Sequence, residues 1–338
     1  MKSIRFLNLE GESHHAVMSC VNAIGASHYT YSEFKTRFPK LNMLLAYSRA
    51  VYLAFAIPKY KVYFLSGSGG LFIAWIKKFV RGEDCKVIVR VNDSLYSKEQ
   101  HTKLKWLILK HLHFAIDGCV AVSDMIKDDI KKVNKNMPVK VFYSPIRDKR
   151  FFKIKPDFKN RGILCLGTAP RTRKGTDVQL TVYKFFRHFV PNKYNFYILG
   201  LKEFVPEQVK EVERNPDFYK YLKFYGNTEP MDYMKKSLFL LHPARFDASP
   251  NAISECMAAG IIPIVSYRSG RKELVAQVDK SLVINSLSYH EYVDKLKQLC
   301  NMKPSQLKKL SNKCKKVANQ YNKKYTMKYF KKLFMELL

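Results

Sequence analysis

The chain has 338 residues, enough for two domains of ordinary size, and its 47% hydrophobic fraction is that of a globular protein. Its 14 glycines and 14 prolines exclude a low-complexity chain. The 60 lysines and arginines against 28 acidic residues give a formal net charge of +32. Such an excess favours a polyanionic partner: nucleic acid, an anionic membrane or a phosphate-bearing substrate.

The cysteines and the apolar segments bear on the compartment. Seven cysteines are scattered without a C-x-x-C pair, and several stand in apolar runs, so we expect buried thiols in a reducing cytosol. We expect that the N-terminal MKSIRFLNLE does not act as a signal peptide, because its apolar run is short and is interrupted by Arg5. Residues 41–58 contain Arg49 and stop at Pro58, which predicts a buried helix rather than a membrane span. We expect a cytoplasmic protein that is soluble or lies on the inner face of a membrane.

Strands and helices alternate through the first half of the chain. Short runs rich in β-branched and aromatic residues predict strands at 3–9, 60–67, 85–93, 118–123 and 139–145. Residues 103–116 and 124–135 carry apolar side chains at helical spacing.

The pattern lapses at the charged segment 147–160 and then resumes. Further strands are predicted at 161–167, 194–200, 221–227, 237–243 and 261–266, again with helical stretches between them. Strands that alternate with helices form parallel βαβ units. We therefore predict an α/β fold of two doubly wound, Rossmann-like domains, residues 1–152 and 153–319, with a cleft at the carboxyl ends of their strands.

Two motifs of the second predicted domain lie at strand ends. In ILCLGTAPRTRKGTDVQL a strand leads through Gly167 to a Lys-Gly pair at 174–175. About seventy residues later, DASPNAISECMAAGIIPIVS places Asp247 and Glu255 eight residues apart, ahead of a Met-Ala-Ala-Gly run. The order and spacing of these motifs resemble the retaining, GT-B-fold "glycosyl transferases group 1" family (family 4 type). The resemblance is good from about residue 115 to 275.

The resemblance implies a hexosyltransferase that uses a nucleotide-diphosphate sugar, a UDP- or GDP-sugar, and a glycan or lipid-linked acceptor, with retention of anomeric configuration. It places the donor in the second domain and the acceptor mainly in the first, with a C-terminal helix at about 320–338 packing back on the first. We expect no cofactor and no metal, because no D-x-D motif stands in a strand-end setting and no His/Cys metal spacing is present.

Three residues are the predicted catalytic groups, and Glu255 lies in the middle of a predicted helix. Ser249 is a natural N-cap, Pro250 suits the first helical position, and Gly260 suits the end. A carboxylate among apolar neighbours has to be partnered or stand at a cleft edge. The resemblance implies that Glu255 accepts hydrogen bonds from two ribose hydroxyls; the alternative is a solvated helix glutamate.

Asp247 and Lys174 are the other two predicted catalytic groups. The resemblance directs Asp247 to hydroxyls of the donor sugar, although the family usually has the longer Glu there; the alternative is a turn residue. Lys174 matches a phosphate-binding lysine, whose cation stabilises the charge on a leaving nucleoside diphosphate; the alternative is one more surface lysine. The N–H groups around Asn251 and Ala252 at the helix start form an anion site for the diphosphate.

The remaining candidates flank the donor and the acceptor. Where the family usually has an arginine after the strand-end glycine, Thr168 stands here, and Arg171 or Arg173 is the substitute cation. Gly226 and Asn227 resemble the strand–loop that holds the base. Strand-end loops of the first domain supply candidates for phosphate, sugar or acceptor contacts, namely Gly11, Ser13, His14, Asn92 and Asp93.

Other interpretations stay open: a protein that binds a polyanion, nucleic acid included, or a phosphorylase or sugar-nucleotide epimerase on the same fold. No nucleic-acid module and no basic segment with stacking aromatics is present, so we expect no nucleic-acid partner. The donor alone does not account for the charge of +32. Lysines mix with apolar residues at 75–81, at 103–114 and in the C-terminal tail, so we expect binding to an anionic membrane; the alternative is a solvated basic surface.

Overall fold

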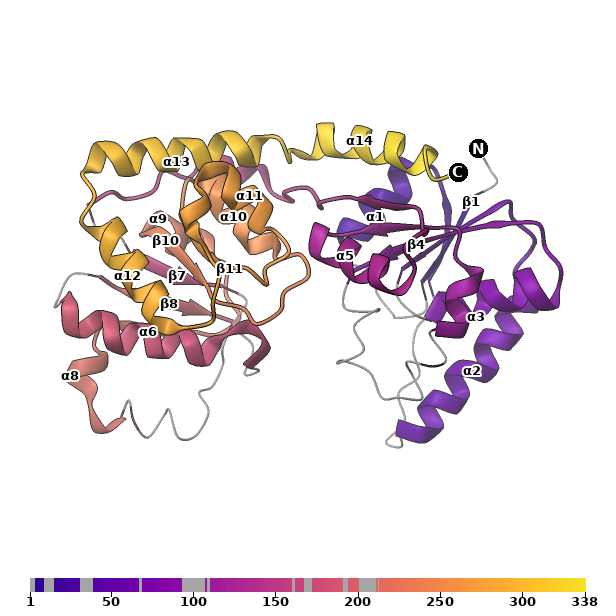
Figure 1. Cartoon of the computed structure of the whole chain (residues 1–338), viewed down its shortest axis with the longest axis horizontal. Coiled ribbons are helices and arrows are strands. Elements are labelled where there is room, and N and C mark those ends of the chain that lie inside the picture. The colour runs from indigo at the N-terminus through magenta and orange to yellow at the C-terminus, as the bar shows by residue number, and fades with distance from the viewer. Residues whose placement is uncertain are drawn as a thin grey trace. The chain divides into compact units, whose positions relative to one another are not determined.

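The computed structural model describes residues 4–8, 15–30, 39–66, 69–92, 107, 110–159, 162–166, 172–190, 194–200, 211 and 213–338. The chain folds into two compact units, residues 1–145 with 323–338 and residues 146–322 (Figure 1). Each unit has its own parallel sheet with helices, which confirms the predicted α/β fold of two doubly wound units.

The N-terminal unit has a six-stranded sheet of order β2-β1-β3-β4-β5-β6, in which every pairing is parallel. Its strands are β1 (Ile4–Asn8), β2 (Ser27–Thr30), β3 (Val62–Ser66), β4 (Lys86–Val91), β5 (Gly118–Ala121) and β6 (Val139–Val141). Its helical segments are α1 (His15–Ala23), α2 (Pro39–Ala56), α3 (Gly69–Trp75), the π-helical η1 (Ile76–Val80), the 3₁₀ turn η3 (His113–Ala115), α5 (Asp124–Val133) and α14 (Lys323–Met335). The winding reverses between β1 and β3, which is the switch point of this sheet.

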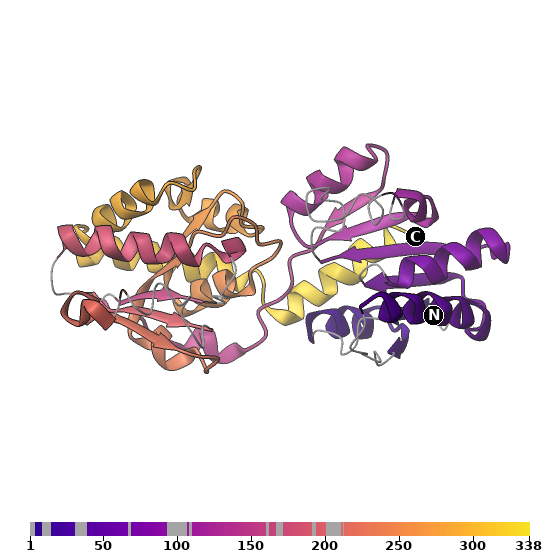
Figure 2. The same cartoon turned by 90° about the horizontal axis from the view of Figure 1, so that it is seen from below.

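Two helices, α1 and α14, pack on one face of this sheet (Figures 1 and 2). Side chains alternate along a strand, so Phe64 and Ile88 point to this face, and Phe142 joins them after β6. The rings of Phe64 and Phe334 lie 5.2 Å apart, and those of Phe142 and Phe330 lie 4.7 Å apart. Each buried ring contributes about 1.5–3 kcal/mol. The C-terminal helix is therefore part of the core of the N-terminal unit.

The C-terminal unit has a second six-stranded parallel sheet, of order β12-β11-β10-β7-β8-β9. Its strands are β7 (Gly162–Cys165), β8 (Phe196–Leu199), β9 (Leu222–Tyr225), β10 (Ser237–His242), β11 (Ile262–Ser266) and β12 (Val283–Ile284). Its helical segments are η4 (Lys149–Lys153), η5 (Thr172–Lys174), α6 (Thr176–Phe189), α8 (Pro216–Tyr219), α9 (Met231–Lys235), α10 (Asn251–Ala259), α11 (Lys272–Val278), η6 (Lys280–Leu282), α12 (Tyr289–Cys300) and α13 (Pro304–Asn319). The switch point lies between β7 and β10, where ligands of such sheets bind.

Helices cover both faces of this second sheet. On one face α6 packs against α12, and on the other α10 and α11 pack against α13 (Figure 1). The ten strands predicted from the sequence are all present. The sequence does not predict β2 and β12, which are four and two residues long.

One segment of the N-terminal unit corrects the sequence analysis. Residues 41–56 are helical as predicted, in α2, but the expectation that this helix is buried is wrong for one face of its last turns, although Leu53 and Ala54 are buried there. Val51 is 41% exposed, Tyr52 69% and Phe55 57%. In the described part of the chain, no helix is long and apolar enough to cross a membrane. All seven cysteines are free and buried, as expected for small hydrophobic residues.

Candidate functional site

The loop between β7 and α6 brings Lys174 to the switch point of the C-terminal sheet. Lys174 ends η5, and Gly175 follows with φ 71°, a left-handed conformation that favours glycine. A Cβ on Gly175 would lie 2.1 Å from the carbonyl oxygen of Pro243, which directly follows β10. Only glycine allows this approach, which places Lys174 beside the segment after β10.

Hydrogen bonds fix these two loops to each other. The backbone N–H groups of Arg245 and Phe246 donate to the carbonyl oxygen of Arg173 at 2.9 and 3.3 Å. Arg173 Nε donates to the Phe246 carbonyl at 3.2 Å, and its guanidinium lies 5.0 Å from the Phe246 ring. Arg245 forms a bidentate pair with Asp177 at 2.6 and 2.5 Å. Arg173, a predicted substitute cation, thus has a role in joining the loops.

Asp247 lies at the centre of the site and is nearly buried, with 8% of its surface exposed. Its Oδ2 accepts a hydrogen bond from Lys174 Nζ and lies 3.3 Å from His242 Nε2. Its backbone N–H donates to the Arg268 carbonyl oxygen at 3.1 Å, and its backbone carbonyl oxygen accepts from the Gly270 N–H at 2.7 Å. Burial raises the pKa of Asp247, but His242 and Lys174 outweigh it and lower the pKa to about 2. Asp247 is therefore ionised at neutral pH.

His242 is a buried residue that the sequence analysis missed. Its side chain is 1% exposed, and its Nδ1 has no hydrogen-bond partner in the described part of the chain. The 3.3 Å approach of Nε2 to Asp247 Oδ2 is within ion-pair distance, but neither ring nitrogen meets the geometry of a hydrogen bond. We treat the contact as electrostatic. The position directly before Pro243, at the end of an apolar strand, is the signal that was available in the sequence.

The start of α10 differs from the prediction. The helix begins at Asn251, and Pro250 rather than Ser249 is its N-cap, without a side-chain capping bond. The prediction placed the N-cap at Ser249 and the first helical residue at Pro250, and it is wrong by one position. Pro250 has ψ 99°, which is an extended backbone conformation. The predicted end is confirmed: Gly260 has φ 82° and closes the helix.

Glu255 is buried in the middle of α10, with 6% of its surface exposed. Arg147 Nε donates to Glu255 Oε1 at 3.3 Å. Burial raises the pKa of Glu255, and the charges of Arg147 and Arg271 moderate the rise. The expectation that this carboxyl group is partnered is met by Arg147, whose own side chain is half exposed.

Arg271 is a second cation that contacts α10, and the sequence analysis missed it as well. It is fully buried, and it donates to Ser254 Oγ at 2.9 Å and to Asn251 Oδ1 at 2.7 Å. These contacts place a positive charge beside the first turn of α10, where backbone N–H groups already favour an anion. Ala252 lies in the same turn.

Other predicted residues are placed less centrally. The Gly226 carbonyl accepts from Gly200 N at 3.0 Å, and Asn227 next to it is exposed. Asn92 belongs to the N-terminal unit, where it donates to Ser66 Oγ at 2.8 Å. The remaining predicted site residues lie outside the described residues: Gly11, Ser13, His14, Asp93, Gly167, Thr168 and Arg171.

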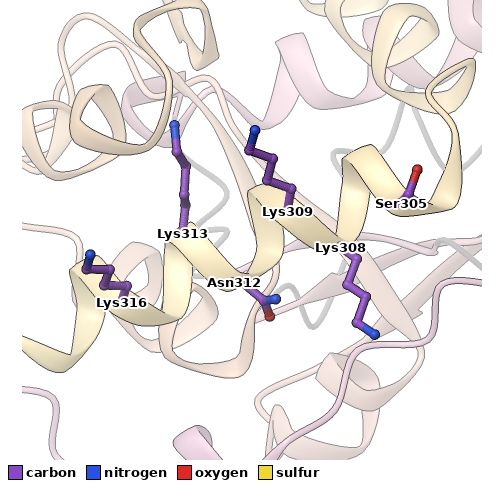
Figure 3. Close-up of a pocket in the computed structure, with 6 residues that line it drawn as sticks. All are labelled: Ser305, Lys308, Lys309, Asn312, Lys313 and Lys316. Atoms are coloured by element: carbon purple, nitrogen blue, oxygen red, sulfur yellow. The ribbon is translucent and has the colours of Figure 1, made fainter.

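A shallow pocket of about 430 Å³ opens on α13 (Figure 3). It is lined by Ser305, Lys308, Lys309, Asn312, Lys313 and Lys316. All six residues come from one helix and none belongs to the predicted site, so this pocket is a basic depression of the surface. Within the described residues, no group of three or more His, Cys, Asp or Glu is placed to hold a metal ion.

The site joins three cations (Lys174, Arg147 and Arg271) and two carboxyl groups around the switch point and the helix start. Such an arrangement can bind a diphosphate through its cations and N–H groups, and hydroxyl groups through its carboxyl oxygens. The model of the family "Glycosyl transferases group 1" matches residues 146–320, which contain all of these groups. No curated protein matches the chain in sequence.

Solved structures match the whole chain in fold at low sequence identity. The sucrose-phosphate synthase from Thermosynechococcus elongatus matches with a TM-score of 0.75 and 12% identity, over 99% of this chain and 98% of that one. HepE from Anabaena, in complex with UDP and glucose, matches with a TM-score of 0.71 and 12% identity, over 99% of both chains. The lipopolysaccharide outer core galactosyltransferase WaaB, without ligand, matches with a TM-score of 0.72 and 15% identity, over 99% of both chains. The predicted GT-B fold is confirmed.

Proposed function

The chain belongs to the group 1 glycosyl transferases, and we propose that it is a retaining hexosyltransferase that takes its sugar from a nucleotide-diphosphate donor. The observation that carries the proposal is the Lys174–Asp247 pair at the switch point, followed directly by α10 with Glu255. The sugar passes to a glycan or a lipid-linked acceptor on the cytoplasmic side of a membrane.

Lys174 and the first turn of α10 stabilise the leaving group in this proposal. As the bond between sugar C1 and the diphosphate oxygen breaks, negative charge grows on the diphosphate. Lys174 Nζ, which donates to Asp247, supplies one fixed cation. The N–H groups of α10, reinforced by the buried Arg271, supply a second positive region. Both act without a metal ion in this proposal.

The two carboxyl groups hold hydroxyls of the donor. Asp247 is ionised, because its pKa is about 2, and it accepts hydrogen bonds from the sugar. Glu255 accepts from the ribose. The acceptor hydroxyl forms the new bond to C1 on the face that the diphosphate leaves, and its proton passes to the leaving phosphate oxygen. Configuration at C1 is therefore retained.

Calorimetry with UDP and GDP tests the donor site. We expect one nucleotide to bind and Lys174→Ala to weaken it at least about tenfold, since a charge-assisted hydrogen bond contributes about 1.5–3 kcal/mol. Lys223→Ala, which removes an exposed lysine from β9 of the same unit, is the matched control and leaves affinity unchanged. Binding is expected to persist in EDTA.

Two results would contradict this proposal. Equal affinity of the wild type and Lys174→Ala for the nucleotide would remove Lys174 from the site. Stabilisation by nucleic acid but by no UDP-, GDP- or ADP-sugar in a thermal-shift screen would favour the polyanion-binding alternative instead.

A further inference from the structure

A polar cluster stands at the carboxyl end of the N-terminal sheet. It consists of Ser66 and Arg90 from the ends of β3 and β4, Asn92 directly after β4, and Ser144 in the segment after β6, and we call it the Arg90 cluster. Three of the members, Ser66, Arg90 and Ser144, each follow a residue of the core by two positions: Phe64, Ile88 and Phe142 all lie in the cluster packed by α1 and α14. Because side chains alternate, the polar residues continue the same face of the sheet. The apolar core on this face thus ends at the polar side chains of the Arg90 cluster.

Hydrogen bonds join the four side chains. Arg90 Nη2 donates to Ser144 Oγ at 2.8 Å, and Arg90 Nη1 donates to Asn92 Oδ1 at 2.5 Å. Asn92 Nδ2 in turn donates to Ser66 Oγ at 2.8 Å. Arg90, Ser66 and Ser144 are buried, whereas Asn92 is exposed. The cluster is therefore reached from solvent at Asn92.

Arg90 is a buried cation whose partners in the described residues are all neutral. It is 3% exposed, and among the described residues no carboxylate pairs with it and its Nε has no hydrogen-bond partner. Burial lowers the pKa of Arg90, and among the described residues only the Cys20 thiol acts against this effect. Lys77, another buried cation of the same unit, does have an acidic partner: it forms an ion pair with Glu83 at 3.3 Å. Arginine is almost never buried without a counter-ion.

We propose that the Arg90 cluster is the binding site for an oxyanion, a phosphate or a carboxylate, carried by the acceptor. The guanidinium offers charge and a planar set of donors that suits such groups. The amide of Asn92 and the hydroxyl of Ser66 offer further neutral contacts. The site lies next to the switch point of this sheet, where ligands of doubly wound folds bind. The assignment of the anion to the acceptor depends on the proposed glycosyl transfer; the anion site does not.

Thermal unfolding with inorganic phosphate and with acetate tests the site. All variants carry Lys174→Ala, which weakens phosphate binding at the donor site equally in every protein compared, and ionic strength is held constant with NaCl. At ten times its Kd, the anion that fits is expected to raise the melting temperature of the N-terminal unit by about 3 °C. Arg90→Met abolishes this rise, whereas Lys59→Met, which removes an exposed cation of the same unit, keeps it. A rise in the melting temperature with phosphate indicates a phosphorylated acceptor. A rise with acetate indicates an acceptor that carries an acidic sugar.

The stability of Arg90→Met without anions is a second, independent readout. Removing an uncompensated buried charge is expected to leave the melting temperature unchanged or higher. A large drop, or failure to fold, shows that Arg90 is held by the fold itself and overturns the proposal. So does an anion response that is equal in the Arg90→Met and Lys59→Met proteins. Arg90→Lys keeps the charge but not the planar donors, and is expected to bind the same anion more weakly.

The outcome separates this site from the proposed function. Nucleotide affinity is measured on the same proteins, with Lys174 intact. If UDP or GDP binds normally and no anion response depends on Arg90, the Arg90 proposal fails and glycosyl transfer stands. If the anion response depends on Arg90 and no nucleotide binds, the anion site stands and the proposed function fails.

Discussion

The two carboxyl groups of the site have opposite electrostatic surroundings. Asp247 has Lys174 and His242 beside it, and its pKa falls to about 2. Burial raises the pKa of Glu255 by more than Arg147 and Arg271 lower it, so the net shift is upward. In the proposed reaction both groups contact hydroxyls, yet ionisation stabilises the fold in one case and opposes it in the other.

Asp247→Asn is expected to destabilise the protein at neutral pH. The folded pKa of about 2 lies below the unfolded value of 3.8, so ionisation stabilises the folded state by about 2 kcal/mol above pH 4. This contribution disappears as the pH falls from about 4 to about 2, and the two proteins converge there. Urea titrations at pH 7, 4 and 3 measure the difference. A constant difference at all three values would mean that the cost is one of packing and not of charge.

Glu255→Gln is expected to lose turnover and to keep its fold. The buried carboxyl group holds its proton to a higher pH when folded than when unfolded, because its pKa is raised above 4.5. Wild-type stability therefore falls as the pH rises through this interval, and the variant has no such fall. We therefore expect the free energy of unfolding of Glu255→Gln to rise relative to that of the wild type between pH 4 and pH 8. Wild-type turnover in the variant would exclude a ribose contact.

Residue spacing predicts the carboxyl groups of the site better than their partners. The eight-residue interval between Asp247 and Glu255 is a local pattern around one helix, and it is visible in the sequence. Arg147 meets Glu255 across 108 residues of chain, and Lys174 meets Asp247 across 73. The Lys174 contact was accessible through a family motif, while Arg147, His242 and Arg271 have no such motif and depend on tertiary packing.

At the scale of elements, apolar runs predict the strands because a parallel sheet is buried on both faces. Every strand of the two sheet interiors has such a run, as in β10, where all six residues are buried. Of the edge strands, β12 has only two residues, and β2 has the sequence SHYT, which contains no apolar run. The exposed face at the end of α2 was predicted as buried because an apolar composition does not indicate which face of a helix lacks a neighbour.

The turn at Gly175 decides where Lys174 lies. Gly175→Ala is expected to cost several kcal/mol, since it adds left-handed strain to a Cβ that would stand 2.1 Å from the Pro243 carbonyl. Gly82→Ala is the control: its φ is +60° and its Cβ meets nothing within 4 Å, so it costs only about 1 kcal/mol. Denaturant titration compares the two. Equal costs would show that the Gly175 loop moves freely away from β10.

At the scale of the whole molecule, the net charge of +32 exceeds what a diphosphate requires. Two basic helices differ in what accompanies their lysines. On α14, exposed lysines stand among Tyr325 and Tyr329, which are 65% and 58% exposed. On α13, the lysines around the depression of Figure 3 have no exposed large apolar neighbour on the same helix. A helix that binds an anionic membrane needs both kinds of residue.

This difference allows a charge-matched test of membrane binding. The first variant changes three exposed lysines of α14 to Gln: Lys328, Lys331 and Lys332. The second changes three exposed lysines of α13 to Gln: Lys308, Lys309 and Lys316. Both lower the net charge equally, so a purely diffuse attraction would weaken equally in both. A docked helix loses about 1 kcal/mol for each lysine near the surface, which amounts to more than a hundredfold for three.

Co-sedimentation with vesicles measures the outcome. We expect the wild type to bind vesicles with anionic lipid and not neutral ones, and binding to weaken at high salt. The α14 variant is expected to lose this binding, and the α13 variant to retain most of it. Wild-type protein that behaves alike on anionic and neutral vesicles would make the charge a solvated basic surface and leave a soluble acceptor. Equal losses in the two variants would keep an electrostatic attraction but remove α14 as the docking element, because the exposed tyrosines would then add nothing.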